Sequence, residues 1–374
     1  MNLIINTSTL SSTGVTQVAV SFINECKKFP ENYYHVFMST TIQKEINIEY
    51  FPDNFKFYLI KNHPLYGIKG FKTRKQLTIF EKEIKPDFVF TIFGPSCWTP
   101  KADHIMGFAN SYYVYPDSPF FNIINLKEKI KISILKIAHR YFLKRNGNYY
   151  ICETDDMSNR LQFFLNIDRS NIFTVSNTYN HFYENPIIGE PILPIKKNNE
   201  FRLLVLSSNA IHKNLNIINK LIHYIEETIT TNSIKFIMTL SDKDFNKYFS
   251  NDAKKYIINL GRVSIEKCPQ IYSECDALFA PTLIESFSAN YPEAMKMRKP
   301  ILTSDLSFSH SICDEAALYF NPTDPLDIIL KIKEIATNKS LYQELIKKGE
   351  KRLESFETAT SRAEKYLKII KSLI

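Results

Sequence analysis

The sequence predicts an α/β protein built from two Rossmann-like domains. Its 374 residues are too many for one ordinary core, and 44% of them are hydrophobic, which is ample for two. Strand-like apolar runs alternate with helix-like runs, which favours parallel sheets covered by helices on both faces. The alternation is interrupted by the proline-containing stretch ENPIIGEPILPIKKNNE at 184–200, which is typical of a linker.

Before this stretch, the pattern predicts one complete parallel sheet. The expected strands are short apolar runs bounded by polar or turn residues: LIIN (3–6), HVFMST (35–40), FKFYLI (55–60), DFVFTIFG (87–94), HIMGFAN (104–110), YYICE (149–153) and IFTVSN (172–177). Helices are expected where apolar residues recur at helical spacing, at about 17–28, 73–84, 126–145 and 156–165.

After this stretch, a second alternation predicts a second sheet. Its expected strands are FRLLVLSS (201–208), IKFIMTL (234–240), YIINLG (256–261), ALFAPT (277–282), PILTSD (300–305) and ALYF (317–320). The expected helices lie at about 215–228, 265–274, 289–297, 325–354 with a break at Asn338, and 357–373.

Composition narrows the class of protein. The chain carries 47 basic and 39 acidic residues, a net charge of +8, which favours a nucleotide, an anionic lipid or a nucleic acid without choosing among them. Its six cysteines form no C-x2-C pair, which predicts reduced thiols in a cytoplasmic protein. No apolar run has the length of a spanning helix, and MNLIINTSTL at 1–10 reads as a first strand and not as a signal peptide.

The stretch ALFAPTLIESFSANYPEAMKMRKPILTSD at 277–305 carries two carboxylates eight positions apart. A strand closed by Pro281 precedes a loop with Glu285, and the helix at 289–297 holds Glu293 about one turn inside it. Two carboxylates in this arrangement are able to accept hydrogen bonds from a polyhydroxyl ligand. The alternative is that both are solvated surface charge.

Peptide N–H groups are expected beside these carboxylates. Those of Ser286, Phe287 and Ser288 lie at the predicted helix start, where an anion such as phosphate is favoured. Sugar hydroxyls on both sides of a phosphate would satisfy both kinds of group, and a nucleotide sugar has that layout.

The segment E-S-F-S-A-N-Y-P-E resembles the E-x7-E element of the retaining, family-4 type glycosyltransferases of the GT-B fold (glycosyl transferases group 1), and the surrounding sequence agrees over most of the chain. In that family the first glutamate contacts the donor sugar and the second the ribose. The resemblance therefore implies these roles for Glu285 and Glu293. It also implies two Rossmann-like domains facing each other across a cleft that holds the ligand.

The same resemblance sets the expected domain boundaries. We expect an N-terminal acceptor domain at 1–188, completed by a C-terminal helix at 359–374 that crosses back onto it. A linker at 189–200 then leads to a nucleotide-sugar donor domain at 201–358.

The resemblance extends to LLVLSSNAIHKN at 203–214, where relatives bind the donor diphosphate with a lysine and an upstream arginine. Lys213 matches the lysine. The alternative is that Lys213 is an ordinary solvated residue at a helix start. Ser208 stands where the arginine commonly is. A hydroxyl still hydrogen-bonds a phosphate, and His212 or Arg262 is a candidate for the missing cation.

A turn formed by Gly261, Arg262 and Val263 resembles the family's G-x-V turn, near which relatives read the base partly through backbone groups. Backbone contacts leave little trace in side-chain identity. The sequence therefore predicts the place of the base pocket but not the base.

In the first half, Thr13 and Gly14 close a small-residue loop where many relatives have two glycines; a glycine permits close approach of a ligand, and an ordinary tight turn is the alternative. Asn110 aligns with the place of a histidine near the reacting centre, whereas His104 comes too early in its strand. Asparagine is no base, which fits a retaining reaction whose leaving phosphate takes the proton. Asn177 is interpreted as structural.

Two further segments have alternative interpretations. The helix at 126–145 combines apolar and basic residues, which suits contact with an anionic membrane or a core-packed helix with a solvated basic face. Asp242 and Asp244 form a D-x-D sequence, the metal site of the other glycosyltransferase fold, GT-A. We interpret it as a surface turn and expect no metal.

The combined interpretation is a metal-independent, retaining glycosyltransferase without a cofactor. It would move a hexose-type sugar from a nucleotide diphosphate to a glycan or lipid-linked acceptor in bacterial surface polysaccharide or lipopolysaccharide synthesis. The expected location is the cytoplasm or the inner face of the cell membrane, with no nucleic-acid partner. The alternatives are a sugar phosphorylase or epimerase of the same shape, and a catalytically weakened sugar-nucleotide-binding or assembly protein of the same fold.

Overall fold

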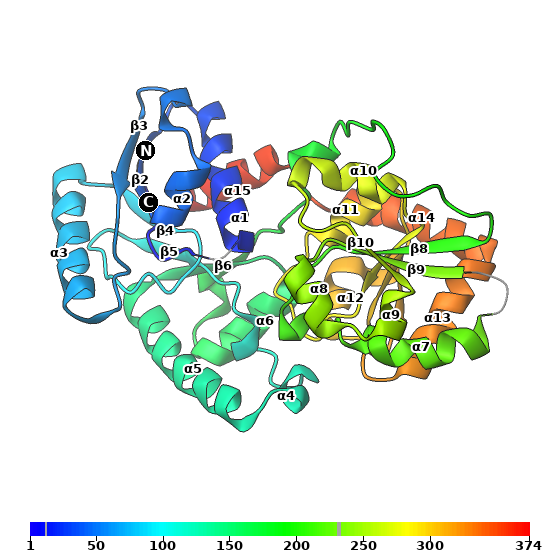
Figure 1. The fold of residues 1–374 in the computed structure, drawn as a ribbon. Helices are drawn as coiled ribbons and strands as arrows, with labels where there is room; N and C mark the ends of the chain where they lie inside the picture. Colours follow the sequence, from blue (N-terminus) through cyan, green and yellow to red (C-terminus); the bar gives the residue numbers. More distant parts are fainter. Residues whose placement is uncertain (12, 230–232) are drawn as a thin grey trace. The chain divides into compact units, whose positions relative to one another are not determined.

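The computed structural model describes residues 1–11, 13–229 and 233–374, which form two compact units (Figure 1). Unit 1 comprises Met1–Val114, Leu126–Asn177 and Glu357–Ile374, and unit 2 comprises Tyr115–Asn125 and Thr178–Phe356. Of the loop expected before the first helix, Ser12 lies outside the described residues.

Unit 1 contains a parallel sheet of seven strands in the order β3-β2-β1-β4-β5-β6-β7. The strands are β1 (Asn2–Thr7), β2 (Tyr33–Met38), β3 (Phe55–Leu59), β4 (Phe88–Thr91), β5 (His104–Gly107), β6 (Tyr149–Cys152) and β7 (Ile172–Thr174). The helices are α1 (Thr13–Glu25), α2 (Thr40–Glu45), α3 (Gly67–Ile84), α5 (Leu126–Asn146), α6 (Asp155–Leu165) and α15 (Ala359–Ser372).

Alternation along β1 divides the core of unit 1 between the two faces of its sheet, because successive strand residues point to opposite sides. Leu3 and Ile5 pack with residues of α1 and α15 in one buried cluster. Ile4 packs on the other face with Leu77 of α3. Parallel strands of a doubly wound sheet are buried on both faces, which explains why the strands read as continuous apolar runs.

The C-terminal helix α15 contributes to the core of unit 1. Ala363, Tyr366 and Ile370 are buried in the same cluster as Leu3 and Ile5. Arg362 donates hydrogen bonds to Asn177 Oδ1 and to the Ser21 hydroxyl. These bonds connect α15 to α1 and to the end of the segment Leu126–Asn177.

Unit 2 contains a parallel sheet of six strands in the order β10-β9-β8-β11-β12-β13. The strands are β8 (Glu200–Val205), β9 (Ser233–Met238), β10 (Ile257–Asn259), β11 (Ala277–Ala280), β12 (Ile301–Ser304) and β13 (Ala317–Phe320). The helices are α4 (Phe120–Ile123), α7 (Ile217–Thr228), α8 (Asp242–Tyr248), α9 (Asn251–Lys254), α10 (Cys268–Ser273), α11 (Asn290–Lys296), α12 (Ser307–Cys313), α13 (Pro325–Thr337) and α14 (Lys339–Leu353). Leu203 faces the α7 and α13 side, and Leu204 faces the α10 and α11 side.

The stretch expected to be a linker, 189–200, is attached to unit 2. Gly189 N donates to Gln270 Oε1 at 2.7 Å, and the Ile192 and Leu193 amides donate to the Glu274 carboxylate. The chain passes from unit 1 to unit 2 after Asn177 and returns after Phe356, whereas we expected boundaries at 188 and 358.

A second difference is the segment Tyr115–Asn125, which belongs to unit 2 although it lies within the first half of the chain. The Ser118 hydroxyl donates to Leu283 O at 2.6 Å, and the ring of Phe120 meets that of His212 edge-on. Long-range contacts of this kind leave no local sequence pattern.

The predicted strands are all found, with ends shifted by a few residues, and the break at Asn338 separates α13 from α14. The interpretation of Asp242 and Asp244 as a surface turn is wrong. They form the first turn of α8, where Ser241 caps the helix by accepting from Asp244 N. Acidic residues at a helix start favour the helix electrostatically.

The close packing at Gly107 predicts that a larger residue there destabilises the protein. A Cβ atom at this position would lie 1.8 Å from the carbonyl oxygen of Ile92, which is backbone and cannot rotate away. We expect Gly107→Ala to lower the free energy of unfolding by about 3 kcal/mol or more, as measured by denaturant titration. The matched control is Gly189→Ala, whose Cβ would meet no atom within 4 Å; equal losses in both variants would contradict the prediction.

Candidate functional site

Lys213 and Glu285 meet at the carboxyl end of the central strands of unit 2. β8 and β11 are parallel neighbours, with Leu203 paired to Ala277. Lys213 ends a short 3₁₀ turn after β8, and Glu285 lies in the loop after β11. The Lys213 ammonium donates to Glu285 Oε1 in an ion pair whose side chains are 20% and 12% exposed. Sequence reasoning named both residues but did not predict that they are paired.

Backbone contacts hold the two loops together. The carbonyl oxygen of His212 accepts from Leu283 N at 2.8 Å, and the Thr282 hydroxyl lies 3.1 Å from the same oxygen. This hydroxyl also lies 3.2 Å from Glu285 Oε1. The position of the Glu285 carboxylate is therefore fixed from two sides, by Lys213 and by Thr282.

A cavity of about 20 Å³ lies beside the ion pair, enough for about one water molecule. Its polar lining includes Ser207, Ser288 and Asn290. Ser208, the residue we aligned with the family's arginine, is exposed and does not line this cavity, whereas its neighbour Ser207 does. No local pattern distinguishes Ser207 from Ser208, because the exact register of a strand end is set by the sheet.

The amides expected at the helix start belong to a loop. α11 begins at Asn290, one residue later than expected, so Ser286, Phe287 and Ser288 precede it by two to four residues. Within the described residues, these three amides donate to no protein acceptor. They remain available as hydrogen-bond donors, without the contribution of a helix dipole.

Glu293 lies in the first turn of α11 and is buried, with 7% of its surface exposed. The hydroxyl of Tyr183 donates to Glu293 Oε2 at 3.0 Å. Burial raises the pKa of Glu293 to about 8, against the opposing effect of this hydrogen bond. At neutral pH the carboxyl group is therefore mainly protonated in this environment. Nothing in the sequence near Tyr183 predicts this contact.

The turn that we expect near the nucleotide base follows β10. Gly261 has φ of 71°, a left-handed conformation that explains why glycine occupies the turn. Arg262 is exposed and close enough to Asp244 to act on its charge, while Val263 packs against the cluster around Tyr272. Among the causes that lower the pKa of Asp244, the hydrogen bond from Ser241 is the largest.

The candidate site residues of unit 1 lie in different environments. Thr13 begins α1, and Gly14 is an exposed helical residue without a positive φ, so the backbone there does not require glycine. Asn110 follows β5 and lines a pocket of about 310 Å³. His104 is fully buried between the Thr91 hydroxyl and Asn146 O, which makes it a core histidine.

The helix α5 presents an apolar outer face. Leu126, Ile130, Ile134, Ile137 and Tyr141 are between 52% and 73% exposed, and at 100° per residue they fall within an arc of about 80°. The buried residues of α5, Leu143 and Asn146, lie on the opposite side of the helix. The inner side of the helix packs through Leu143, but its solvated face is apolar as well as basic, which differs from the alternative of a core-packed helix with a solvated basic face.

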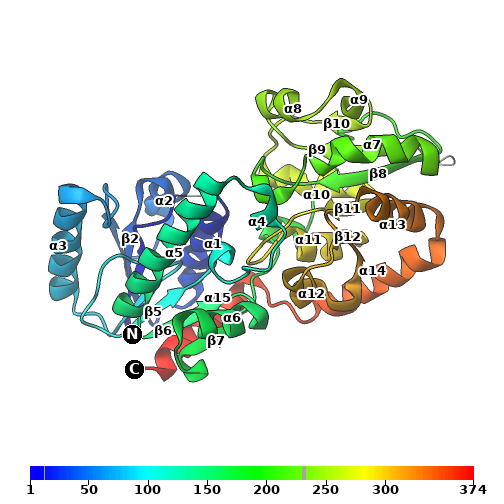
Figure 2. The same cartoon turned by 90° about the horizontal axis from the view of Figure 1, so that it is seen from below.

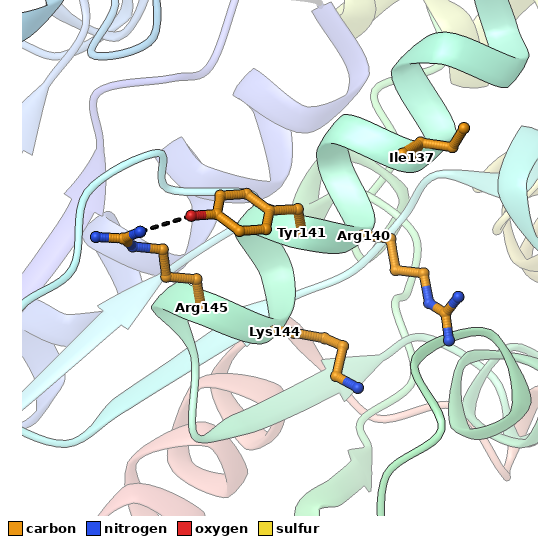
Figure 3. Close-up of a pocket in the computed structure, with 5 residues that line it drawn as sticks. All are labelled: Ile137, Arg140, Tyr141, Lys144 and Arg145. Carbon is orange, nitrogen blue, oxygen red and sulfur yellow. Dashed lines mark hydrogen bonds between the residues drawn. The ribbon is translucent and has the colours of Figure 1, made fainter.

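Basic side chains border this outer face, and one of them, Lys144, falls within its arc. The exposed ones are Lys127, Lys129, Lys131, Arg140, Lys144 and Arg145. Figure 3 shows five side chains around a shallow hollow on the helix, with Arg145 donating to the Tyr141 hydroxyl at 2.5 Å. α5 runs along the surface of unit 1 (Figure 2). Among the described residues, no helix has the length and hydropathy needed to span a bilayer.

Comparison with known proteins gives three kinds of match. Residues 194–352 match the family model described as Glycosyl transferases group 1. The chain is 24% identical over 228 residues to the O-antigen chain mannosyltransferase RfbU of Salmonella typhimurium (strain LT2), a match that covers 60% of this chain. It spans 58% of RfbU, less than two thirds of that relative's length.

Solved structures match over the whole chain. HepE of Anabaena, solved in complex with UDP and glucose, has a TM-score of 0.70 at 9% identity and covers 99% of each chain. WaaG, a glycosyltransferase involved in lipopolysaccharide biosynthesis, has a TM-score of 0.68 at 13% identity, covering 98% of this chain and 99% of its own. The predicted GT-B fold is confirmed, and the resemblance to group 1 glycosyltransferases is confirmed for residues 194–352.

Burial of Glu293 predicts a pH-dependent stability. A folded-state pKa of about 8, raised from 4.5, means that the folded chain keeps a proton that the unfolded chain releases, so stability is lost as pH rises through this window. Glu293→Gln is neutral at every pH. Its free energy of unfolding, compared with that of the wild type, should therefore increase by a few kcal/mol between about pH 5 and pH 8. Thermal unfolding across this range measures the difference.

The control for this experiment is Glu364→Gln, which changes an exposed glutamate. It should stay parallel to the wild type at every pH. A gap between Glu293→Gln and the wild type that is constant with pH would contradict the proposed protonation of Glu293.

Proposed function

We propose that this protein, with its GT-B fold and group 1 glycosyltransferase region, is a retaining hexosyltransferase that uses a nucleotide-diphosphate sugar. The observation that carries the proposal is the Lys213–Glu285 pair beside three loop amides without protein acceptors. A cation and free N–H donors suit a diphosphate, and a fixed carboxylate suits sugar hydroxyls. Both follow the carboxyl ends of β8 and β11, where the strand order of the sheet reverses, which is the usual ligand position in such a sheet.

Lys213 is able to hydrogen-bond Glu285 and a phosphate at the same time. An ammonium group has three donors, so it can keep its bond to Glu285 and donate to a phosphate oxygen. As the bond from the anomeric carbon to the diphosphate breaks, negative charge develops on the phosphate and positive charge on the sugar. Lys213 and the loop amides would stabilise the first, and Glu285 the second. The cavity side chains Ser207 and Asn290 are further hydrogen-bonding groups for the donor.

Glu293 would bind the ribose. A protonated carboxyl group offers one donor and one acceptor, which matches a pair of vicinal hydroxyls. Tyr183, which now donates to Glu293, would have to share or release this bond. Gly261, Arg262 and Val263 remain the proposed neighbours of the base.

The relatives support a hexose and a glycan acceptor. RfbU is named as an O-antigen chain mannosyltransferase, and HepE was solved with UDP and glucose. We propose that this chain likewise acts in synthesis of a bacterial surface polysaccharide or lipopolysaccharide, at a glycan or lipid-linked acceptor hydroxyl. The positive groups around the diphosphate come from the protein in this proposal, so no metal and no cofactor are required.

Glu285→Gln tests the assignment directly. The variant keeps the shape of the side chain and one acceptor oxygen, replaces the other oxygen with an NH₂ donor, and removes the charge that would stabilise the sugar. We expect sugar transfer to fall by about 100-fold or more while nucleotide binding is retained. The measurement is turnover of nucleotide-sugar donors, together with thermal shifts by UDP, GDP, ADP and CMP with and without a chelator.

The thermal shifts separate the alternatives. Stabilisation by one nucleoside diphosphate that survives the chelator, with transfer lost in Glu285→Gln, supports the proposal. Stabilisation that the chelator abolishes overturns the metal-independent part of it. Nucleotide binding without transfer by the wild type to any glycan acceptor would favour a catalytically weakened binding protein, and near-normal transfer by Glu285→Gln would remove the role of Glu285.

We further propose that the outer face of α5 binds an anionic membrane surface, which would bring the enzyme to lipid-linked acceptors. Apolar residues in one stripe suit insertion at the level of the headgroups, and basic residues on both sides suit anionic lipids. This charge pattern favours a lipid surface over an apolar protein partner. The location would then be peripheral, at the inner face of the cell membrane.

Vesicle sedimentation tests the membrane contact. The wild type should bind vesicles that contain an anionic lipid, and bind less as salt increases. Ile130→Ser with Ile134→Ser should weaken this binding by about tenfold or more, since both exposed side chains lose apolar area. The matched control is Leu326→Ser with Leu330→Ser, on the exposed side of α13. Equal binding to neutral vesicles, or equal effects of both pairs, would contradict the proposal.

A further inference from the structure

The segment Tyr115–Asn125 packs against the two loops of unit 2 that carry Lys213 and Glu285. It belongs to unit 2, whereas the chain on either side of it belongs to unit 1. The ring of Tyr115 meets that of Phe308 in α12 edge-on. The buried residues of the segment are Tyr115, Ser118, Phe120 and Ile124. So much burial in a segment with one short helix indicates a fitted contact and not a solvated loop.

The hydroxyl group of Ser118 has one possible orientation. It accepts from Phe120 N at 3.1 Å and donates to Leu283 O at 2.6 Å. An amide only donates and a carbonyl oxygen only accepts, so the hydroxyl hydrogen points at Leu283. Ser118 is buried, and water therefore competes little for this bond.

Leu283 is the backbone anchor of the loop that carries Glu285. Its N–H donates to His212 O at 2.8 Å, and its carbonyl oxygen accepts from Ser118. Within the described part of the chain, no backbone hydrogen bond joins two residues of the loop 281–287. The side chains of Leu283 and Ile284 are buried and add packing. The loop therefore takes its shape from its neighbours, and losing one of these contacts would let it shift.

The same segment also reaches the turn that ends in Lys213. The ring of Phe120 meets that of His212 edge-on, with ring centroids 6.5 Å apart. Burial lowers the pKa of His212, so its ring is mainly neutral at pH 7, which disfavours His212 as the missing cation. The ring instead packs against Phe120, while the carbonyl oxygen of His212 accepts from Leu283 N. Both loops of the ion pair are thus in contact with one segment from the first half of the chain.

We propose that Ser118 and Phe120 are positioning residues for the donor site. Ser118 holds the loop of Glu285, and Phe120 holds the turn of Lys213, so that the carboxylate and the ammonium keep their places. The catalytic meaning of this arrangement rests on the proposed transferase function. In that function Glu285 has to lie close to the sugar when positive charge develops, and a small displacement then costs more in rate than in binding.

The first experiment is amide hydrogen exchange on the full chain without nucleotide. Ser118→Ala removes the donor to Leu283 O. The peptide that contains Leu283 should then exchange about fivefold faster, the range of one hydrogen bond. Phe120→Leu keeps an apolar side chain but loses the ring edge at His212, so it should accelerate exchange in the peptide that contains Lys213.

The matched control is Ser273→Ala, in α10 of unit 2. It also removes a hydroxyl that donates to a backbone carbonyl oxygen at 2.6 Å, that of Gln270. This variant should leave hydrogen exchange in both loops unchanged, because Ser273 contacts neither of them.

The second experiment measures release of nucleoside diphosphate from UDP-glucose and GDP-mannose in the presence of glycan acceptors. Ser118→Ala should lower kcat about tenfold and change the KM for the donor less than about twofold, because the diphosphate contacts are kept. In a Glu285→Gln background, Ser118→Ala should have little further effect, since it acts through a charge that is already absent. Ser273→Ala should leave kcat unchanged in both backgrounds.

Three results would overturn the proposal. They are unchanged exchange of the Leu283 peptide in Ser118→Ala, an equal loss of kcat in both backgrounds, and equal effects of Ser118→Ala and Ser273→Ala. If Ser118→Ala does not fold, Phe120→Leu is measured in the same two backgrounds. Unchanged exchange of the Lys213 peptide, or an equal loss of kcat in both backgrounds, then overturns the proposal.

Failure of the transferase function is a separate outcome. A wild type that releases nucleoside diphosphate from neither donor would remove the transferase proposal, and the catalytic role of Ser118 and Phe120 with it. The exchange data would still decide whether these two residues hold the loops. Normal turnover by Ser118→Ala, with faster exchange of the Leu283 peptide, would remove the positioning role and leave the transferase function intact.

Discussion

The reversal of strand order in the sheet of unit 2 is the constraint on which the candidate site depends. β8 and β11 are hydrogen-bonded neighbours, although Lys213 and Glu285 are 72 residues apart in the chain. α7 follows β8 and covers one face of the sheet, whereas α11 follows β11 and covers the other. The ends of the two strands therefore leave a space that side chains and ligands fill. In unit 1 the same relation holds between β1 and β4, and the pocket with Asn110 lies there.

The two glutamates of the E-x7-E element have opposite environments. Glu285 is held by an ion pair with Lys213 and by the Thr282 hydroxyl. Glu293 is buried, and burial raises its pKa to about 8 although the hydrogen bond from Tyr183 acts in the opposite direction. When environments differ in this way, two carboxyl groups of the same type perform different tasks. One is suited to stabilising positive charge, and the other is suited to binding hydroxyl groups without a charge.

In unit 1, α5 begins where the segment Tyr115–Asn125 of unit 2 ends. The outer side of α5 exposes Ile134 and Ile137 between basic residues, and the segment before it contacts the loops of Lys213 and Glu285. A membrane contact of α5 would therefore be joined directly along the chain to the residues that hold the donor loops. The two proposals nevertheless rest on different residues and different physical interactions, so each can fail without the other.

The sequence by itself determined the two parallel sheets, the order of their elements and the residues Lys213, Glu285 and Glu293. The sheets follow from apolar runs of strand length and from helical spacing, and the three residues follow from the resemblance of 203–214 and of the nine residues from Glu285 to Glu293 to motifs of a known family. The tertiary structure alone decided that Lys213 is paired to Glu285, that Tyr183 covers Glu293, and that Ser207 lines the cavity beside them. It also brought Ser118 and Phe120, from the first half of the chain, to the loops of the ion pair. Contacts between residues far apart in the chain depend on strand order and burial, and a single sequence carries no local trace of them.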